Sequence, residues 1–282
     1  MPPLSLPDER TGLPAAEDIQ HSREVLARAL QGIESGHRAV LGSGAQRILC
    51  FGDPEADTLV VHFHGGGYRQ GQPEMVGSYA ARLADAAGVE VWCPAYRLAP
   101  EHPFPAALID AIQVQAPLQK RRPRRLVLAG DSAGGGLAAA LVQAFAAQGL
   151  VLAGLILNSP WLDLRVTSDS YSRNAASDPF FSQAAASKAA AAYLQGHDAC
   201  DPLVTPLLAD PANYPPTLLT VGSGEVLLDD ALAFSEQMGA AGNPVRLREV
   251  ASMEHIAVIR GPQHTGSQVV FDDTVSFLRD LR

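Results

Sequence analysis

The sequence of 282 residues predicts an α/β fold built on a mostly parallel, doubly wound sheet. Six short apolar runs are bounded by turn residues, which is typical of buried strands. Alanine- and leucine-rich stretches of helical length lie between most of these runs. Strands that alternate with helices in this way pair in parallel. A hydrophobic fraction of 47% with 18% charged residues is ample for the core of such a domain.

The expected elements follow one another along most of the chain. The predicted strands are residues 59–63, 89–93, 125–130, 152–158, 217–222 and 245–250, and a further strand near 47–51 precedes them in a hairpin. The predicted helices lie around residues 74–87, 105–119, 133–148, 228–241 and 267–281. In a sheet of this kind, we expect the working residues in loops beyond the carboxyl ends of the strands.

Two stretches depart from the alternation of strands and helices. Residues 1–45 look helical around Glu17 to Ile33 and have proline-rich ends, and residues 163–200 form a long insertion with an alanine-rich helix near 184–194. Both stretches either pack as a lid over the carboxyl ends of the strands or are ordinary surface helices. We divide the chain into an N-terminal lid segment (1–45), a core (46–162 and 201–282) and a lid insertion (163–200).

Charge and cysteine content exclude several function classes. The formal net charge of −9 argues against a nucleic-acid partner, which would require a basic surface. No apolar run approaches the roughly 18 residues that indicate a membrane span, and the N-terminus lacks the layout of a secretion signal. Cys50, Cys93 and Cys200 are widely separated and form no metal-ligand pair. We therefore expect a reduced cytoplasmic protein without structural disulfides or a metal.

A serine stands at a turn that has the pattern of a nucleophile elbow. Residues 130–136 read Gly-Asp-Ser-Ala-Gly-Gly-Gly, between an apolar run and an alanine-rich helix. A sharp turn there would lift Ser132 out of the sheet so that its hydroxyl can attack a carbonyl. Gly130 and Gly134 leave room that a larger side chain would fill. The alternative is a plain strand-to-helix turn with serine as the helix N-cap.

A glycine-rich loop follows another predicted strand, residues 59–63. It reads His64-Gly65-Gly66-Gly67-Tyr68. Such a loop can present backbone N–H groups to an anion, and acyl transfer needs such donors where the tetrahedral oxyanion forms. The alternatives are a flexible loop and a phosphate cradle. No phosphate-binding fingerprint is present, which weakens the phosphate interpretation.

A serine nucleophile needs a base, and the base needs an orienting acid. His255 lies a short loop after the strand 245–250. In hydrolases whose triad runs serine, acid, histidine along the chain, the base occupies this position after the last strand. Glu225 is the first carboxylate beyond the preceding strand and still lies in a loop. Asp229 is the alternative acid, but it opens the next helix, where a carboxylate complements the helix dipole.

Three motifs in order give the chain a resemblance to a known family. His64-Gly65-Gly66-Gly67, the run Tyr96–Ala107 (Tyr-Arg-Leu-Ala-Pro-Glu-His-Pro-Phe-Pro-Ala-Ala) and Gly-Asp-Ser-Ala-Gly-Gly at 130–135 resemble the hormone-sensitive lipase family. These are the bacterial family IV carboxylesterases of the α/β-hydrolase fold. The similarity spans about residues 45–282.

The resemblance implies roles for the motif residues. It implies Ser132 as nucleophile, His255 as base and an oxyanion hole formed by the backbone amides of Gly66, Gly67 and Ala133. No metal or organic cofactor is implied, and a homodimer through an edge strand is expected by resemblance only.

The chain departs from the family pattern in two places. The acid is usually the first aspartate of a D-P-L-x-D pattern, whereas Glu225 occupies that position here and Asp229 matches the second aspartate. The added methylene requires the loop to sit slightly farther from His255. After His255, Ile256 and Ala257 replace a small residue and an aromatic, which affects the shape of the pocket near the base.

The sequence therefore predicts a serine carboxylesterase for esters of short to medium acyl chain. The residues expected to line its pocket, or alternatively to pack in the core, are Tyr68, Trp161, Leu162, Phe180, Phe181 and Ile256. Arg97 and Glu101 are expected to form a network that braces the oxyanion loop. The alternative activities are those of a lactonase, an amidase or an arylformamidase with the same triad. A non-catalytic receptor on this fold would lose the histidine, which is retained here.

Overall fold

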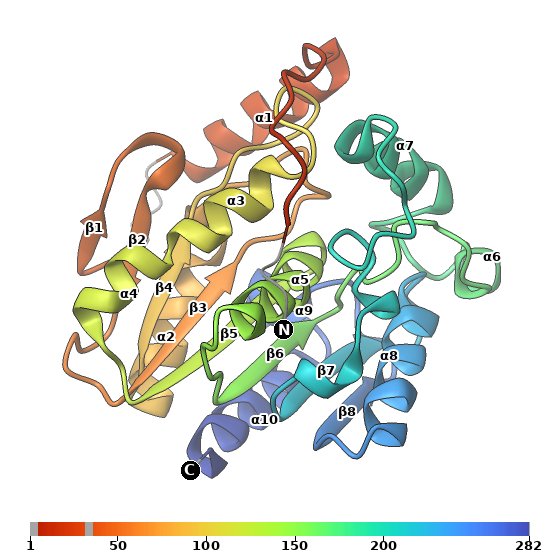
Figure 1. Cartoon of the computed structure of the whole chain (residues 1–282). Coiled ribbons are helices and arrows are strands. Elements are labelled where there is room, and N and C mark those ends of the chain that lie inside the picture. Colours follow the sequence, from red (N-terminus) through yellow and green to blue (C-terminus); the bar gives the residue numbers. More distant parts are fainter. Residues whose placement is uncertain (1–4, 32–35, 282) are drawn as a thin grey trace.

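The structure of the protein, a computed structural model, describes residues 5–31 and 36–281. Within these residues, eight strands form one sheet in the order β1-β2-β4-β3-β5-β6-β7-β8 (Figure 1). The strands are β1 (Ala39–Leu41), β2 (Ile48–Phe51), β3 (Thr58–Phe63), β4 (Glu90–Pro94), β5 (Arg125–Asp131), β6 (Gly154–Asn158), β7 (Thr217–Gly222) and β8 (Val245–Val250).

The sheet is parallel from β4 to β8 and antiparallel at the other edge. β2 pairs antiparallel with both β1 and β4, whereas β4, β3, β5, β6, β7 and β8 run in one direction. The predicted α/β fold with a mostly parallel sheet is thus confirmed, and the strand expected near 47–51 is antiparallel as a hairpin requires. The short strand β1, which the sequence did not predict, is its partner.

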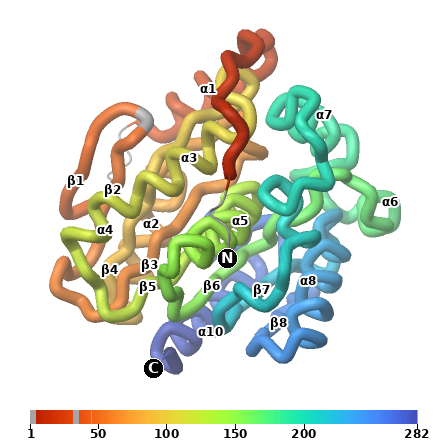
Figure 2. The backbone as a smooth tube through the Cα atoms, viewed as in Figure 1, coloured from red at the N-terminus to blue at the C-terminus, as the bar shows by residue number. Residues whose placement is uncertain are grey.

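Helices cover both faces of the sheet (Figures 1 and 2). The α-helices of the described residues are α1 (Glu17–Leu30), α2 (Gly77–Ala87), α3 (Ala106–Gln113), α4 (Gln115–Arg121), α5 (Ala133–Ala147), α6 (Ser170–Arg173), α7 (Gln183–Leu194), α8 (Leu228–Ala240), α9 (Ala257–Arg260) and α10 (Ser267–Asp280). One apolar layer includes side chains of α3, α5 and α8, and the other includes side chains of α2, α9 and α10.

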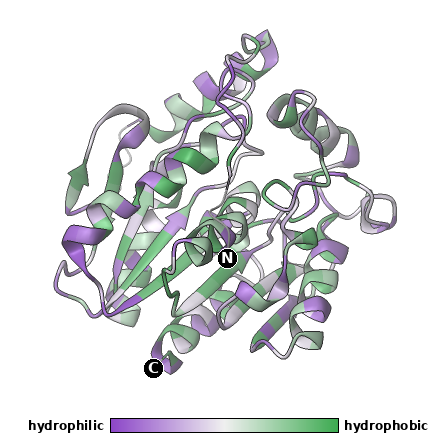
Figure 3. Cartoon of the chain, viewed as in Figure 1, coloured by the Kyte–Doolittle hydropathy of each residue, from purple (hydrophilic) through white to green (hydrophobic). Residues whose placement is uncertain are grey.

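The central strands are apolar because they are buried on both faces. All residues of β3, β6 and β7 are buried, and Figure 3 shows apolar residues along these strands and on the helices beside them. Valine and leucine are suited to such strands, which read as continuous apolar runs in place of an alternating pattern. The core therefore holds the carboxyl ends of β3, β5, β6 and β7 rigidly side by side.

One expected helix is divided. The sequence predicted a single helix over 105–119, but α3 ends at Gln113 and α4 begins at Gln115. Pro117 explains the break, because proline has no N–H to donate to the carbonyl of Gln113 and its ring crowds that carbonyl. The stretch expected as a helix from residue 74 likewise begins with a 3-10 turn, Pro73–Val76, before α2.

The segments expected to form a lid contact loops at the carboxyl ends of the strands. Arg23 of α1 donates to the backbone carbonyls of Arg69 and Ala99, in the loops after β3 and β4. In α7, the methyl group of Ala189 lies over Gly67. The helix expected around Glu17 to Ile33 runs from Glu17 to Leu30, and residues 32 and 33 lie outside the described residues, as do residues 1–4. The three-part division of the chain stays a prediction.

None of the helices in the described ranges is both long and apolar enough to cross a membrane.

Candidate active site

Ser132 lies at the sharp turn between β5 and α5. Its backbone has φ 53° and ψ −123°, a conformation that residues with a side chain rarely adopt. The two flanking glycines are required by close packing. A Cβ at Gly130 would lie 2.2 Å from the carbonyl oxygen of Gly134, and a Cβ at Gly134 would lie 2.2 Å from that of Phe63. The turn therefore raises the serine hydroxyl above the ends of β3 and β5.

The side chains of Ser132, His255 and Glu225 form a continuous hydrogen-bonded chain. His255 Nε2 lies 2.9 Å from Ser132 Oγ, and His255 Nδ1 lies 2.7 Å from Glu225 Oε2. The three residues follow β5, β8 and β7, whose carboxyl ends lie on the same edge of the sheet. All three are buried, with Ser132 6% and His255 8% exposed.

The Glu225 carboxylate is held from the side opposite His255. Its Oε1 accepts hydrogen bonds from the Ser159 hydroxyl at 2.8 Å and from the backbone N–H of Gly222 at 2.6 Å. The Ser159 hydroxyl also accepts from the backbone N–H of Ile256 at 3.2 Å. These bonds turn the longer glutamate side chain back toward the end of its own strand. The extra methylene is thereby accommodated.

Ser159 was not identified from the sequence. It directly follows the predicted strand 152–158, so its place at the carboxyl end of that strand was a usable signal.

Asp229, the alternative acid, lies elsewhere. It stands in the first turn of α8, and its carboxylate accepts from the backbone N–H of Ser170 at 2.8 Å and pairs with the Arg173 guanidinium. Both partners belong to the insertion. The partner of His255 Nδ1 is thus Glu225, and Asp229 connects α8 to α6.

The environment of His255 favours its protonated form. Burial alone would lower the pKa of the imidazole, but the hydrogen bond and the charge of Glu225 outweigh burial and raise the pKa above 6.5. The carboxylates of Asp178 and Asp131 act in the same direction. An imidazole with this environment can take up a proton from Ser132 readily, because the imidazolium that forms is stabilised.

The glycine-rich loop passes directly beside Ser132. Gly66 and Gly67 have φ values of +118° and +61°, and a Cβ at Gly66 would lie 2.0 Å from the carbonyl oxygen of Gln70. A Cβ at Gly65 would lie 3.1 Å from the Cβ atom of Ser132. Ala133, the third predicted oxyanion donor, is the first residue of α5. The loop after β3 and the amino end of α5 therefore meet at the serine.

Of the six residues predicted to line a pocket, four lie among the aromatic side chains near His255 and α7, and two do not. Phe181 lies with its ring parallel to that of His255, 6.0 Å between ring centroids, and touches Trp161 edge-on. Ile256 is half-buried directly after His255. Tyr68 stacks on Tyr193 of α7 with ring centroids 4.0 Å apart.

Leu162 and Phe180 have other surroundings. Leu162 is fully buried, and its backbone N–H donates to Asp230. Phe180 is 49% exposed, and its ring lies under the Arg260 guanidinium.

The predicted network of Arg97 with Glu101 is wrong. Arg97 pairs with Asp110 and Glu9, whereas Glu101 accepts two hydrogen bonds from Arg23 of α1. The two side chains serve separate contacts because each has its own partner from the N-terminal segment. Sequence reasoning missed both partners, since nothing local relates residues 9 and 23 to the loop after β4.

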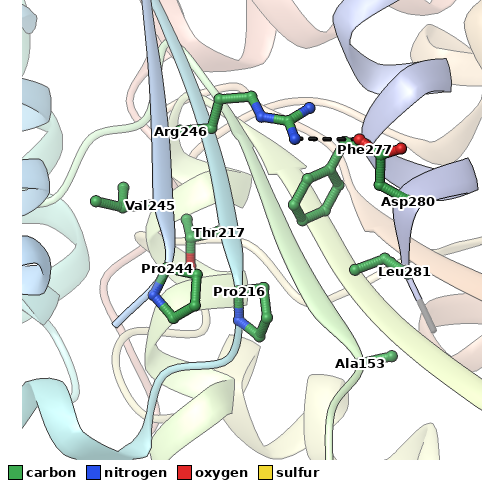
Figure 4. Close-up of a pocket in the computed structure, with 9 residues that line it drawn as sticks. All are labelled: Ala153, Pro216, Thr217, Pro244, Val245, Arg246, Phe277, Asp280 and Leu281. Atoms are coloured by element: carbon green, nitrogen blue, oxygen red, sulfur yellow. Dashed lines mark hydrogen bonds and ion pairs between the residues drawn. The ribbon is translucent and has the colours of Figure 1, made fainter. Parts of the chain in front are cut away.

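A cavity of about 510 Å³ opens at the amino ends of β6, β7 and β8, the edge of the sheet opposite the serine (Figure 4). Arg246 and Asp280 form an ion pair across it, and its walls include Phe277 and Leu281. In the described part of the chain, no cluster of His, Cys, Asp and Glu side chains is placed to hold a metal ion.

Comparisons with known proteins relate the chain to one family. Residues 60–259 match the family model described as alpha/beta hydrolase fold. An acetyl-hydrolase of Streptomyces hygroscopicus is 40% identical over 200 residues, which cover 70% of this chain and 67% of that protein. An esterase of Acinetobacter venetianus is 39% identical over 203 residues, with coverage of 70% and 67%.

Solved structures support the same relationship. A hormone-sensitive lipase from a metagenome library superposes with a TM-score of 0.86 at 29% identity, covering 96% of this chain and 94% of that one. An esterase from the bacterial hormone-sensitive lipase family superposes with a TM-score of 0.84 at 32% identity, covering 95% and 93%. The chain therefore belongs to the α/β-hydrolase family, within its hormone-sensitive lipase branch of carboxylic ester hydrolases.

Proposed function

We propose that this carboxylic ester hydrolase works through an acyl-enzyme on Ser132, with His255 as base and Glu225 as the orienting acid. The observation that carries the proposal is the unbroken hydrogen-bonded chain from Glu225 Oε2 through the imidazole to Ser132 Oγ, with distances of 2.7 and 2.9 Å. A serine hydroxyl is a weak nucleophile until an adjacent base accepts its proton. The two distances support His255 in the role of that base.

The reaction follows in two half-steps. His255 Nε2 takes the Ser132 proton while Oγ bonds to the ester carbonyl carbon, and the carbonyl oxygen becomes an oxyanion. The tetrahedral intermediate collapses, and the alcohol leaves with the proton from His255. A water molecule then adds to the acyl-enzyme, giving its proton to His255, and the acid is released as Ser132 regains a proton. Glu225 holds the imidazole in the required tautomer and stabilises the imidazolium.

The backbone amides of Gly66, Gly67 and Ala133 are the donors we propose for the oxyanion. The positive φ values of Gly66 and Gly67 support this role, because they turn the loop tightly directly after Gly65, which lies beside Ser132. Removal of one such donor in a serine hydrolase typically lowers kcat by about 10²–10³.

We propose short- to medium-chain esters as substrates. Support comes from three buried aromatic residues. The backbone N–H of Trp161 donates to the Ser132 carbonyl at 3.0 Å, and the Tyr68 ring packs against the rings of Trp161 and Tyr193. Such walls leave space for a small acyl group more readily than for a long chain. The Streptomyces relative is named an acetyl-hydrolase, which agrees with this expectation.

The expected homodimer and cytoplasmic location stay predictions. β8 is an edge strand with β7 as its neighbour in the sheet, which is where pairing with a second copy would take place. Cys50, Cys93 and Cys200 are free thiols.

A covalent probe tests the nucleophile. A fluorophosphonate followed by peptide mapping should modify Ser132 and abolish hydrolysis of p-nitrophenyl acetate. The Ser132→Ala variant should be neither labelled nor active, whereas Ser177→Ala, which alters an exposed serine, should behave as the parent protein does. An adduct at another residue, or none, would refute the proposed mechanism.

A substrate panel tests the ester assignment. We expect p-nitrophenyl acetate and butyrate to be hydrolysed with higher kcat/KM than lactones, anilides or N-formylkynurenine. Faster turnover of any of the latter three would assign lactonase, amidase or arylformamidase activity to the same serine.

A further inference from the structure

A buried histidine and aspartate lie behind the glycine-rich loop and take no part in the proposed reaction steps. His62 of β3 and Asp131 of β5 are 0% and 1% exposed. His62 Nε2 lies 3.0 Å from Asp131 Oδ1. In this hydrogen bond the imidazole N–H donates and the carboxylate oxygen accepts. Within the described residues, His62 Nδ1 has no hydrogen-bond partner, so Asp131 is the group that this imidazole serves.

The second oxygen of Asp131 reaches the glycine-rich loop. Asp131 Oδ2 accepts the backbone N–H of Gly65 at 2.9 Å. Gly65 immediately precedes Gly66 and Gly67, and Asp131 immediately precedes Ser132. A Cβ at Gly65 would lie 2.5 Å from Asp131 Oδ2, so the contact is also sterically close. The carboxylate of the residue beside the nucleophile thus binds the loop after β3.

This connection joins two segments that must be aligned with each other. The proposed oxyanion donors come from separate loops, Gly66 and Gly67 after β3 and Ala133 after β5. Strand pairing aligns β3 and β5 only as far as Phe63 and Gly130. Beyond that point, the Gly65–Asp131 hydrogen bond continues the alignment into the loops. Oxyanion stabilisation depends on donors placed within a few tenths of an ångström, so a shift at this link would move the proposed donors out of place.

Stability alone does not account for the pair. β3 is apolar at Leu59, Val60, Val61 and Phe63, and an apolar residue at position 62 would suit the same layer. Buried charged groups contribute little net stability even when they are hydrogen-bonded, and well-packed apolar residues of similar volume often replace them without loss. The pair is explained if it has a geometric task.

We propose that His62 and Asp131 are positioning residues that hold the oxyanion loop against Ser132. His62 orients and stabilises the Asp131 carboxylate, and that carboxylate fixes Gly65 and hence the amides of Gly66 and Gly67. The proposal rests on the proposed function, because it assigns a task in building that oxyanion hole.

Two substitutions at position 62 form the test. His62→Gln keeps an N–H donor near the position of Nε2, whereas His62→Leu fills similar space without a donor. With p-nitrophenyl acetate, we expect His62→Leu to lower kcat about tenfold or more with KM nearly unchanged, and His62→Gln to retain about a third or more of the parent kcat. A trifluoromethyl ketone, which forms an oxyanion on the serine, should bind His62→Leu more weakly by the same factor as the loss in kcat.

Asp131→Ala is the second variant and decides the matter if His62→Leu does not fold. It removes the carboxylate that accepts the Gly65 N–H, and we expect a similar loss in kcat and in ketone affinity. The low-field proton NMR signal of the His255–Glu225 hydrogen bond should remain, because the triad is untouched. Parent-like kcat and ketone affinity in a folded variant lacking the donor or the carboxylate would overturn the proposal, as would equal losses in His62→Gln and His62→Leu. Fluorophosphonate labelling of Ser132 in the parent protein separates these outcomes from a failure of the proposed function.

Discussion

The backbone at Ser132 is strained, and the strain follows from the position of the hydroxyl. Holding a residue that has a Cβ at φ 53° and ψ −123° raises the free energy of the folded state by on the order of 1–3 kcal/mol. The packing of the strand and helix around Gly130 and Gly134 compensates for this cost and leaves the serine at the tip of the turn.

We predict that Ser132→Gly is inactive but more stable than Ser132→Ala. Both variants lack the hydroxyl, and only glycine relieves the unfavourable backbone conformation. The glycine variant should unfold about 2–4 °C higher than the alanine variant. The greater freedom of glycine in the unfolded chain acts against this difference. Thermal unfolding of the two variants in one buffer measures it. A less stable glycine variant would show that the turn is not strained.

The two candidate acids should differ strongly in their effect on turnover. Glu225→Ala removes the partner of His255 Nδ1 and should lower kcat by about 10³–10⁴. Asp229→Ala removes contacts to Ser170 and Arg173 and should leave kcat within about threefold of the parent value. Steady-state kinetics of the two variants compare them directly. The reverse ranking would assign the acid to Asp229.

The pH dependence of kcat/KM should report on His255. The base must be neutral to accept the Ser132 proton, so kcat/KM should rise with pH and reach half its maximum above pH 6.5, since the pKa of His255 is raised. In Glu225→Gln the charge that raises this pKa is lost. The half-maximal point should therefore move to lower pH, together with a lower maximum. Asp229→Asn is the control and should keep the parent profile.

At the scale of elements, the amino end of α8 anchors the insertion. The Asp230 carboxylate accepts from the backbone N–H groups of Leu162 and Asp163 and from the Ser168 hydroxyl. Asp229 accepts from the backbone N–H of Ser170. The adjacent carboxylates of Asp229 and Asp230 therefore hold the segment between the end of β6 and the start of α6. The helix that follows Glu225 therefore also positions the start of the insertion.

Asp230 should make stability depend on pH. Burial raises the pKa of its carboxyl from 3.8 to about 7, the hydrogen bond from Ser168 opposes the rise and the Asp163 carboxylate adds to it. Between about pH 4 and 7 the folded protein keeps a proton that the unfolded chain has released, so the free energy of unfolding falls as pH rises through this window. The unfolding temperature of the parent should therefore drop between pH 5 and pH 8, and in Asp230→Asn this drop should be smaller by a few degrees. Asp229→Asn, which removes the neighbouring carboxylate, should leave the fall unchanged.

At the scale of the whole molecule, the N-terminal segment ties distant parts together. Arg10 donates to the backbone carbonyls of Leu194 and Gln195 at the end of α7, and Arg23 binds Glu101 and two loop carbonyls. Figures 1 and 2 show α1 lying beside the loops of the core near α3. The segment thus contacts both the core and the insertion, at residues that are remote in the sequence from Arg10 and Arg23.

Arg23→Ala should loosen this segment selectively. The substitution removes hydrogen bonds to Glu101, Arg69 and Ala99, whereas Arg28→Ala removes an exposed pair with Glu24. Charged hydrogen bonds in a partly buried setting are worth more than an exposed pair. Thermolysin should cleave α1 about tenfold faster in Arg23→Ala than in the parent or in Arg28→Ala. Equal cleavage rates would show that α1 is held by other contacts.

Much of the fold was predictable because its signals are local. The apolar runs of β3, β5 and β7 and the alanine-rich helix α5 have patterns that read correctly without knowledge of their neighbours. β1 was missed because three residues of an edge strand carry too little pattern, and the break between α3 and α4 was missed although Pro117 marks it.

The sequence by itself determined the fold class, the family and the candidate nucleophile, base and oxyanion loop, because short motifs and their chain order carry that information. The tertiary structure alone decided that Glu225 contacts His255, that Ser159 holds Glu225, and that His62 and Asp131 reach Gly65. Each of these contacts joins residues between 30 and 69 positions apart. Local patterns say nothing about such distances, which depend on how the strands lie beside one another in the sheet.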